Sequence, residues 1–425
     1  MTTQINNENK KLNFSNEREQ SQACLNSAEH EKNQGRKVLN VPNKREQNQT
    51  CLDSAEREGL RPKGNVPNLR FPEFQGEWEK CKLGEICNVF MCKRILASQT
   101  NAEGGIPFYK IGTIGGTPDA YISKELFDEY KEKYNYPHKG EVMITCAGTV
   151  GKCVIYDGKD AYYQDSNIVW IDNPSHNISN GFLCHLLSNV DWRKLNSTTI
   201  IRIYNDDLRN LKLNYPLREE QQRISKLLSL LDERIATQNK IIDKLQSLIK
   251  GIAQKIVHCN KTNVRLSECV ECSSSTLQES DVCEHGAYPV YGANGIVGYL
   301  DNYNTEGEAV YIIKDGSGVG TVSYVTGKCS ATGTLNTLQA KEGYSLQYLY
   351  YLLKVFNFEP YKTGMAIPHI YFKDYGKANF FCPSYTEQLQ YARLLFAIDS
   401  KLSAEQNIQT NLCLQKQYLL CEIFI

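Results

Sequence analysis

The sequence lacks any apolar run near the roughly 20 residues that a transmembrane helix needs, and residues 1–16 are polar, without the apolar core of a secretory signal. It also lacks an excess of charge of one sign, because 48 Lys and Arg residues balance 48 Asp and Glu residues. We therefore expect a cytoplasmic protein with no membrane partner, in which any attraction to nucleic acid rests on local positive charge. A length of 425 residues predicts two to four folded units.

Cysteine is plentiful, with 16 residues, and in a cytoplasmic protein of this length we expect reduced thiols rather than disulfides. The close pair Cys269 and Cys272 is followed by Cys283 and His285, which superficially resembles a set of zinc ligands. The spacing fits no common zinc finger. The sequence therefore predicts no metal site.

A short duplication occupies the first part of the chain. Residues 18–31 (REQSQACLNSAEHE) return at 45–58 (REQNQTCLDSAERE), and each copy is followed by Asn-Val-Pro-Asn. The segment is rich in amide and charged residues and nearly free of aromatics, so it offers little apolar surface to offset the entropy of ordering the chain. We interpret residues 1–68 as a disordered extension that contains the repeat.

A larger repeat organises the rest of the chain at an offset of 167 residues. Pro216, Glu220 and Gln221 recur as Pro383, Glu387 and Gln388, and further matches lie on either side. The molecule is therefore a duplicated unit, and each copy is a globular module followed by a long helix. The predicted boundaries are 69–215 for the first module, 216–256 for its helix, 257–382 for the second module and 383–425 for its helix.

Both predicted helices carry an apolar heptad seam. From Ile224 to Ile256, apolar residues advance by alternating steps of four and three, broken only at Gln238; the second copy is weaker and breaks at the matching Glu405. A helix of about 40 residues is roughly 60 Å long, too long for one module to cover. We therefore predict that the two helices pack on each other rather than each capping its own module. The packing residues are Ile224, Leu228, Leu231, Ile235, Ile242, Leu245, Leu395, Ile398, Leu402 and Leu412.

Each module shows short β-type runs separated by glycine-rich turns, together with one short amphipathic helix. The pattern predicts an α+β fold. The runs are 140–145, 154–156, 168–171, 309–313, 322–325 and 333–338, and the helices are 182–190 and 346–356.

No catalytic constellation stands out. The loop 147–152 evokes a phosphate-binding loop, but Cys146 and Cys153 stand where that motif needs glycine and Ser/Thr. Asp119 with Glu129 and Lys131 resembles a nuclease set, yet residues 123–134 look like a charged helix with a solvated face. We predict no catalytic residue in this chain.

Binding residues are easier to find, because basic, amide, hydroxyl and aromatic side chains gather near the predicted turns. Lys and Arg neutralise phosphates, and Gln, Asn, Arg and Ser/Thr reach base edges in the major groove. The DNA-binding candidates are Lys110, Thr149, Lys152, Gln164, Asn167, Arg202 and Tyr204 in the first module and Lys314, Ser317, Thr321, Asn336 and Tyr371 in the second.

From residue 66 onward the chain resembles the specificity subunits of type I restriction-modification systems. Several separate motifs carry the resemblance: VPNLRFPEFQGEW at 66–78, KLGEI at 82–86, PLREEQQ at 216–222, YPVYGANG at 288–295, KDGSGVG at 314–320, IPHIYFKD at 367–374 and PSYTEQ at 383–388. The duplicated extension lies outside the usual pattern of the family.

This resemblance implies two tandem target recognition domains, each reading one half of a split, asymmetric sequence in duplex DNA. The long helices would pack antiparallel about a pseudo-twofold axis and fix the separation of the half-sites. Two modification (methyltransferase) subunits would dock on this scaffold, and restriction-translocase subunits would join them. Cofactors would belong to those partners, namely S-adenosylmethionine, ATP and Mg²⁺, and none to this chain.

Two other functions remain open from the residues alone. A coiled-coil adaptor without nucleic-acid specificity would explain the helices, but not the two related yet divergent modules. A metal-dependent nuclease would need more than the doubtful set around Asp119. Salt dependence separates the first of these from DNA recognition, because phosphate contacts weaken steeply as salt rises.

Overall fold

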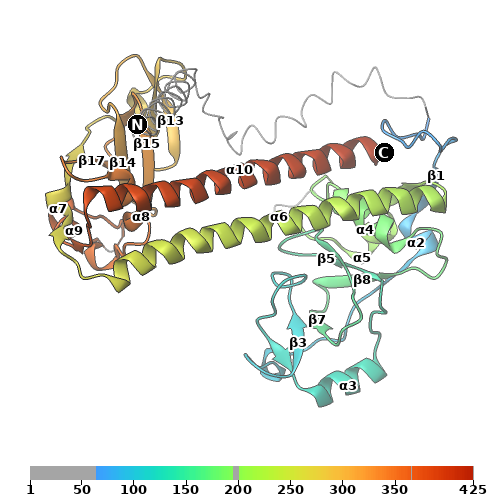
Figure 1. Ribbon diagram of the computed structural model, residues 1–425. Helices are drawn as coiled ribbons and strands as arrows, with labels where there is room; N and C mark the ends of the chain where they lie inside the picture. The colour runs from blue at the N-terminus through green and yellow to red at the C-terminus, as the bar shows by residue number, and fades with distance from the viewer. Residues whose placement is uncertain (1–63, 195–200, 365, 425) are drawn as a thin grey trace, which may run out of the picture. The chain divides into compact units, whose positions relative to one another are not determined.

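The computed structural model describes residues 64–194, 201–364 and 366–424 (Figure 1). Most of the predicted extension, including both copies of the short repeat, lies outside these ranges. Packed structure begins slightly before the boundary at residue 69, because Asn65 is buried and its side-chain amide donates to the carbonyl of Trp78. None of the described helices is long and apolar enough to cross a membrane.

Module 1 contains a four-stranded sheet in the order β2-β8-β5-β6, a three-stranded sheet in the order β4-β3-β7 and the ribbon β1-β9. All strand pairs are antiparallel except β3 with β7. Its strands are β1 (Glu79–Lys82), β2 (Asn88–Phe90), β3 (Ile106–Tyr109), β4 (Tyr121–Ile122), β5 (Val142–Thr145), β6 (Cys153–Ile155), β7 (Tyr162–Tyr163), β8 (Ile168–Asp172) and β9 (Lys212–Tyr215). Its helices are α2 (Leu83–Ile86), η5 (Ala97–Gln99), α3 (Lys124–Lys133), α4 (Asn180–Asn189) and α5 (Asn205–Arg209).

Module 2 repeats this plan strand for strand, with sheets β11-β17-β14-β15 and β13-β12-β16 and the ribbon β10-β18. The single parallel pair again lies in the smaller sheet, between β12 and β16. Its strands are β10 (Val264–Arg265), β11 (Val270–Ser274), β12 (Tyr288–Gly292), β13 (Gly295–Leu300), β14 (Glu308–Ile313), β15 (Val322–Thr326), β16 (Ser330–Ala331), β17 (Leu335–Ala340) and β18 (Asn379–Phe380). Its helices are α7 (Leu266–Cys269), η6 (Glu279–Asp281), α8 (Leu346–Leu353), η7 (Glu359–Tyr361) and α9 (Phe372–Tyr375). The predicted α+β duplication is confirmed.

The larger sheet of each module has a core on both of its faces. In β5, Val142 and Ile144 pack with α4 and the long helix α6, whereas Met143 faces the smaller sheet. In β14, Val310 and Tyr311 divide between the two sides in the same way. Neighbouring strand residues point to opposite faces of the sheet, so side chains of the two cores cover both faces. The loops at the strand ends are the parts of the sheet that remain open to a ligand.

The two long helices, α6 (Arg218–Cys259) and α10 (Tyr385–Ile423), pack against each other (Figure 1). Acidic residues occupy the first turn of each, where they favour the positive end of the helix dipole. The side chain of Ser384 caps α10 by accepting from the backbone of Glu387. α6 extends three residues beyond the predicted end at 256.

The helices run antiparallel. Ile224, near the start of α6, shares a core with Ile423 at the end of α10, and Ile256 near the end of α6 shares a core with Leu395 near the start of α10. The predicted packing positions are buried or half-buried: Ile224, Leu228, Leu231, Ile235, Ile242, Leu245, Leu395, Ile398, Leu402 and Leu412. A heptad seam along each helix therefore joins the two copies, as the pseudo-twofold arrangement requires.

A buried glutamine fastens each long helix to its own module. Gln221 Oε1 accepts the backbone N–H of Ser179 at 2.7 Å, and Gln388 Oε1 accepts that of Ser345 at 2.9 Å. Each glutamine also donates to the carbonyl of the proline five residues before it, at 2.8 and 2.9 Å. Ser179 and Ser345 are the N-cap residues of α4 and α8. The same hydrogen-bonded contact therefore fixes the orientation of each module on its own long helix.

Candidate nucleic-acid interface

Each module presents one hairpin loop built on the same hydrogen-bond frame. Residues 146–152 connect β5 to β6, and residues 314–321 connect β14 to β15; we call them the tip loops. In both, the N–H of the last glycine donates at 2.9 Å to the carbonyl of the residue that ends the first strand, namely Gly151 to Thr145 and Gly320 to Ile313. The duplication has therefore preserved the hydrogen bond that closes the loop, although the two loops differ in sequence and by one residue in length.

Both of these glycines are required by their surroundings. Gly151 has φ +82° and Gly320 has φ +89°, in the region that favours glycine. A Cβ at Gly151 would lie 2.4 Å from the Trp192 ring, and one at Gly320 would lie 3.0 Å from Cβ of Phe358. Each tip loop therefore rests on a buried aromatic side chain that holds its position.

Two further segments lie against each tip loop. The N–H of Ile203 donates to the carbonyl of Cys146, and the N–H of Ile370 donates to the carbonyl of Lys314, both at 2.9 Å. On the other side of the tip loop lies the turn that precedes β8 or β17. The N–H of Cys146 donates to the carbonyl of Asn167 at 2.7 Å in module 1, and the N–H of Lys314 donates to the carbonyl of Thr334 at 3.0 Å in module 2. In each module, the recognition surface is the tip loop together with the segment that contains Ile203 or Ile370 and the turn that contains Asn167 or Thr334.

All seven candidates of module 1 belong to or border its recognition surface. Thr149 and Lys152 are exposed in the tip loop, and Gln164 and Asn167 lie in the adjacent turn. The N–H of Gln164 donates to the carbonyl of Tyr109, which brings Lys110 beside that turn. The remaining members, Arg202 and Tyr204, come from the segment that contacts Cys146.

Arg202 and Tyr204 form a cation-aromatic pair at the edge of this surface. The guanidinium of Arg202 lies 5.9 Å from the ring centre of Tyr204 and donates to the carbonyl of Ser166 at 3.1 Å. Tyr204 is 59% exposed. A cation held against an exposed ring is suited to contacts with phosphate and with sugar or base faces.

Module 2 repeats this edge with different residues. Tyr371, at the position that matches Tyr204, is 50% exposed, and the ammonium of Lys373 lies 5.2 Å from its ring centre. Ser317 and Thr321 are exposed in the tip loop, and Lys314 begins it. The two modules therefore present surfaces of the same construction but of different chemistry.

Asn336 does not belong to the recognition surface, and its prediction as a DNA contact is wrong. It lies within β17, is only 4% exposed and points to the same face as Leu338, toward the helices. Its amide donates to the hydroxyl of Tyr375 at 2.9 Å, and its Oδ1 accepts from Ser274 at 3.0 Å. The residue is used within the core and has no free polar group for DNA.

Two residues that the prediction did not select, Asp315 and Thr334, also take part in this surface. Nδ1 of His369 lies 2.5 Å from Oδ1 of Asp315, which ties the tip loop to the segment before α9. Thr334 occupies in module 2 the position that Asn167 occupies in module 1. The 167-residue offset would have identified Thr334, but no sequence signal predicts the pairing of His369 with Asp315.

The other chemistries considered from the sequence gain no support from the geometry. Burial raises the pKa of Cys146 to about 12, so the thiol is neutral and unsuited to nucleophilic attack. Asp119 forms an ion pair with Lys110 at 3.1 Å, and Glu129 pairs along α3 with Lys133. The predicted charged helix at 123–134 is present as α3.

The sulfur of Cys269 lies 3.9 Å from that of Cys382, not beside Cys272. Within 64–194, 201–364 and 366–424, no group of three or more His, Cys, Asp and Glu residues is placed to hold a metal ion. The fourteen cysteines described there are free thiols.

Comparison with known proteins agrees with this construction. Residues 75–247 and 260–412 each match the type I restriction modification DNA specificity domain. A protein of Haemophilus influenzae assigned as the type I restriction enzyme specificity subunit S.HindORF215P is 48% identical over 169 residues, which cover 40% of this chain and 43% of the relative. The EcoprrI specificity subunit of Escherichia coli is 26% identical over 113 residues, covering 27% and 28%. The chain thus aligns with less than half the length of these relatives.

The fold has a counterpart among solved structures. The crystal structure of a type I restriction-modification S subunit from M. genitalium superposes with a TM-score of 0.61 over 85% of this chain and 99% of that one, at 18% identity. The duplicated architecture and the two matched halves point to one family. The chain belongs to the type I restriction-modification DNA specificity domain family.

Proposed function

We propose that this chain is the DNA specificity subunit of a type I restriction-modification complex, in which each module reads one half of a bipartite duplex target. The observation that carries this proposal is the recognition surface built twice on one frame, with tip loops of different sequence. Two copies of one scaffold with divergent tips are what reading two unlike half-sites requires. Lys152 and Arg202 in module 1, and Lys314 and Lys373 in module 2, supply local positive charge on a chain without net charge.

The helix pair sets the distance between the half-sites in this proposal. Each long helix is fastened to its own module by the buried glutamine and to the other copy by the seam. Inserting one heptad into both helices would lengthen the pair by about 10.5 Å, close to three base pairs of DNA. The spacer between the half-sites should grow, while the bases of each half-site stay the same.

The helix pair also carries a second, exposed stripe that fits protein partners. Leu227, Arg234 and Ile241 follow one another at heptad spacing on α6, and Leu394, Lys401 and Ile408 occupy the matching places on α10. Exposed apolar residues repeated on both copies indicate two equivalent docking surfaces. We assign them to two modification (methyltransferase) subunits, with restriction-translocase subunits joining the assembly.

The chemistry of modification and cleavage is carried by those partners in this proposal. S-adenosylmethionine would be bound by the modification subunits, and ATP and Mg²⁺ by the restriction-translocase subunits. This chain contributes base recognition and scaffolding.

Methylation mapping tests the proposal directly. The chain is co-expressed with its modification subunits, and methylated adenines are mapped across the host genome. We expect one bipartite motif, of which a single half changes when the recognition surface of one module is exchanged. A purified complex that contains all subunits yet methylates without sequence preference would overturn the proposal.

A further inference from the structure

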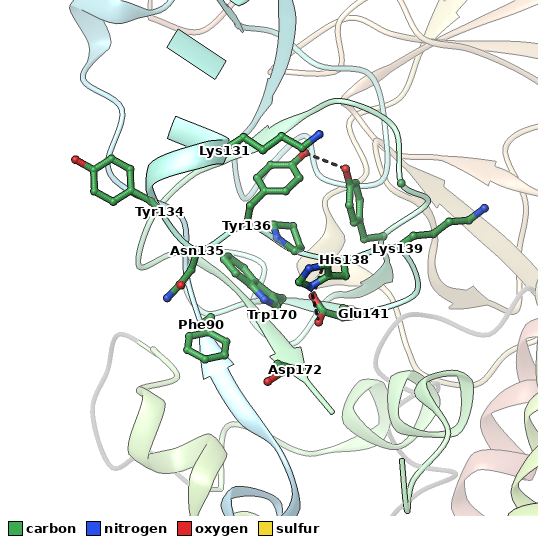
Figure 2. A pocket seen from close by; sticks show the side chains of 13 residues that line it. Phe90, Lys131, Tyr134, Asn135, Tyr136, His138, Lys139, Glu141, Trp170 and Asp172 are labelled. Carbon is green, nitrogen blue, oxygen red and sulfur yellow. Dashed lines mark hydrogen bonds and ion pairs between the residues drawn. The ribbon is translucent and has the colours of Figure 1, made fainter. Parts of the chain in front are cut away.

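A pocket of about 570 Å³ lies in module 1, apart from the recognition surface (Figure 2). Phe90 of β2 and Trp170 and Asp172 of β8 form part of its wall, and Glu141 lies just before β5. The other lining residues come from α3, from the segment 134–139 and from the end of β6 and the turn after it: Lys131, Tyr134, Asn135, Tyr136, Pro137, His138, Lys139, Tyr156 and Gly158.

The pocket lies at the far end of the strands that carry the recognition surface. β5 runs from Glu141 at the pocket to the tip loop that begins at Cys146, and β8 runs from the turn at Asn167 to Asp172 at the pocket. At about 3.3 Å per residue, the two sites are separated by more than 10 Å along the sheet. A duplex held by the tip loop therefore leaves the pocket free.

The floor of the pocket is acidic. Glu141 is buried, and its carboxylate accepts the backbone N–H of His138 at 2.7 Å. Asp172 accepts the side-chain amide of Asn88 at 3.0 Å. Burial raises the pKa of Glu141, the contacts with His138 lower it in part, and the negative charge of Asp172 adds a smaller rise. A cation placed between the Glu141 and Asp172 carboxylates would be attracted by both.

The lysines that line the pocket do not supply that cation. The ammonium of Lys131 lies 3.0 Å from Asp160 and 4.9 Å from the ring centre of Tyr136. Figure 2 shows the amine of Lys139 pointing away from Glu141 and Asp172. The exposed imidazole of His138 contacts Glu141, with Nδ1 3.5 Å from Oε1 (Figure 2). Neither Lys131 nor Lys139 pairs with Glu141 or Asp172, so a foreign cation can occupy the space beside these carboxylates.

We propose that this pocket binds the guanidinium group of an arginine side chain presented by a partner protein, with Glu141 and Asp172 accepting its N–H groups. The ring of Phe90, which packs on the buried Trp170 with ring centres 6.2 Å apart, would lie against its plane. A guanidinium suits the site better than an ammonium because it is planar, carries five donors and stacks on aromatic rings. A DNA phosphate is disfavoured, since the two carboxylates would repel it.

Among the described residues, module 2 does not repeat the lining of this pocket, whereas it does repeat the recognition surface. The strand register pairs Phe90 with Trp170 in module 1, and the matching pair in module 2 is Ser273 with Thr337. The place of Asp172 is taken by Gln339, because β8 and β17 share the 167-residue offset. Module 2 therefore lacks the aromatic wall and the acid, and the partner would engage one module only.

Calorimetry on the full chain tests the ligand class. The probe is N-acetyl-arginine methylamide, and the neutral citrulline analogue of the same shape is its matched control. We expect a dissociation constant on the order of 1 mM for the arginine probe, the weak end of the affinity range, and at least tenfold weaker binding by citrulline. Glu141→Gln and Asp172→Asn should each weaken arginine binding about tenfold, whereas Glu103→Gln, at an exposed acid outside the pocket, should not.

Several outcomes would overturn the assignment. Equal binding of arginine and citrulline removes the charge argument, and stronger binding of the lysine analogue or of spermidine makes the site one for an ammonium or polyamine. Unchanged arginine binding in both acid variants, with thermal melts like those of the parent, places the probe elsewhere.

A crosslinking arm tests whether the arginine comes from a protein. A photoreactive amino acid replaces Tyr134, which lines the pocket and is exposed, in the complex with modification subunits. We expect a crosslink to a partner chain that the arginine probe suppresses. Crosslinking to DNA alone, or to no chain in a complex that methylates normally, would contradict a protein source while leaving the specificity function intact.

Discussion

Gln238 of α6 donates its side-chain amide to the backbone carbonyl of Glu405 of α10 at 3.0 Å and also to the Glu405 carboxylate. The two residues are 167 positions apart, so they occupy the same place in the two copies. Each residue interrupts the apolar seam of its own helix, and the two polar side chains form hydrogen bonds with each other's residue across the seam. A polar pair at one seam position fixes register, since any slip of the helices would leave the buried Gln238 amide without its partner.

This pair predicts a pH dependence of stability. The Lys401 ammonium and the Gln238 amide lower the pKa of Glu405 below its ordinary value of 4.5. A carboxyl with a lowered pKa in the folded state stabilises that state above its unfolded pKa, and the contribution is lost as the pH falls through the folded pKa. Glu405→Gln should therefore reduce the urea midpoint at about pH 6 and have a smaller effect at about pH 3.5. Glu233→Gln, at an exposed acid on α6, is the control, and an equal loss at both pH values would contradict the prediction.

The helix pair and the duplication could be predicted because they depend on local periodicity and on an offset visible in the printed letters. The matching breaks at Gln238 and Glu405 were visible too, but their hydrogen bond was not, because it depends on the antiparallel alignment of two distant helices. Asn336 was assigned to the DNA surface because its side-chain type suits base contacts. Its position in the strand turns it toward the core, and a one-residue difference in strand position reverses the face of a side chain.

The pocket of module 1 could not be predicted either. Its wall combines Phe90 of β2, Trp170 and Asp172 of β8 and a segment that follows α3, three parts of the chain that lie far apart in sequence. The tip loops, in contrast, were predicted from the clustering of glycine in short segments. Turn chemistry is local, whereas a cavity is a property of the packed tertiary structure.

Removing either buried joint should loosen a module from its helix. Gln221→Ala or Gln388→Ala leaves a buried backbone N–H and a carbonyl without their partner, which costs about 1–3 kcal/mol. Urea unfolding of the full chain measures the loss. The exposed neighbours Gln222→Ala and Gln390→Ala remove the same side chain and should change stability little. A loss of similar size in the neighbours would contradict the role of the buried hydrogen bonds, because alanine has a higher helix propensity than glutamine.

Glycine replacement should disturb one tip loop at a time. Gly151→Ala places a methyl group against Trp192 and strains a backbone at φ +82°, so we expect a destabilisation of about 1–3 kcal/mol. DNA binding should weaken further if the loop moves. Gly112→Ala is the matched control, because a Cβ there meets no atom within 4 Å. Thermal melting and duplex binding by fluorescence anisotropy report the two effects separately.

Charge and aromatic contacts at the recognition surface should differ in their salt response. Lys152→Gln should weaken duplex binding for all sequences and reduce the slope of log affinity against log salt by about 1, because one phosphate contact is lost. Tyr204→Ala should change discrimination at one half-site and leave the slope unchanged. Lys159→Gln removes an exposed lysine outside this surface and should alter neither. A salt slope unaffected by Lys152→Gln would place that residue away from phosphate.

The exposed stripe on the helix pair predicts the stoichiometry of the complex. Leu227→Lys on α6 and Leu394→Lys on α10 should each remove one of two modification subunits, because each places a charge in one of two apolar docking surfaces. Native mass spectrometry of the co-purified complex counts the subunits. Gln246→Lys adds the same charge at an exposed polar position of α6 and should leave both in place. Retention of two subunits in the double leucine variant would exclude this stripe.

The core of module 1 has a consequence for synthesis on the ribosome. Ile423 belongs to that core, Phe424 packs against Phe182 with ring centres 5.2 Å apart, and Asn189 donates to the carbonyl of Leu420 at 3.2 Å. Residue 215, the last of module 1, is translated more than 200 residues before these contacting residues. Until then part of its apolar surface stays uncovered, so module 1 depends on the last turn of α10 for completion. Premature termination before that turn should release an aggregation-prone nascent product although the sequence of module 1 itself is unchanged.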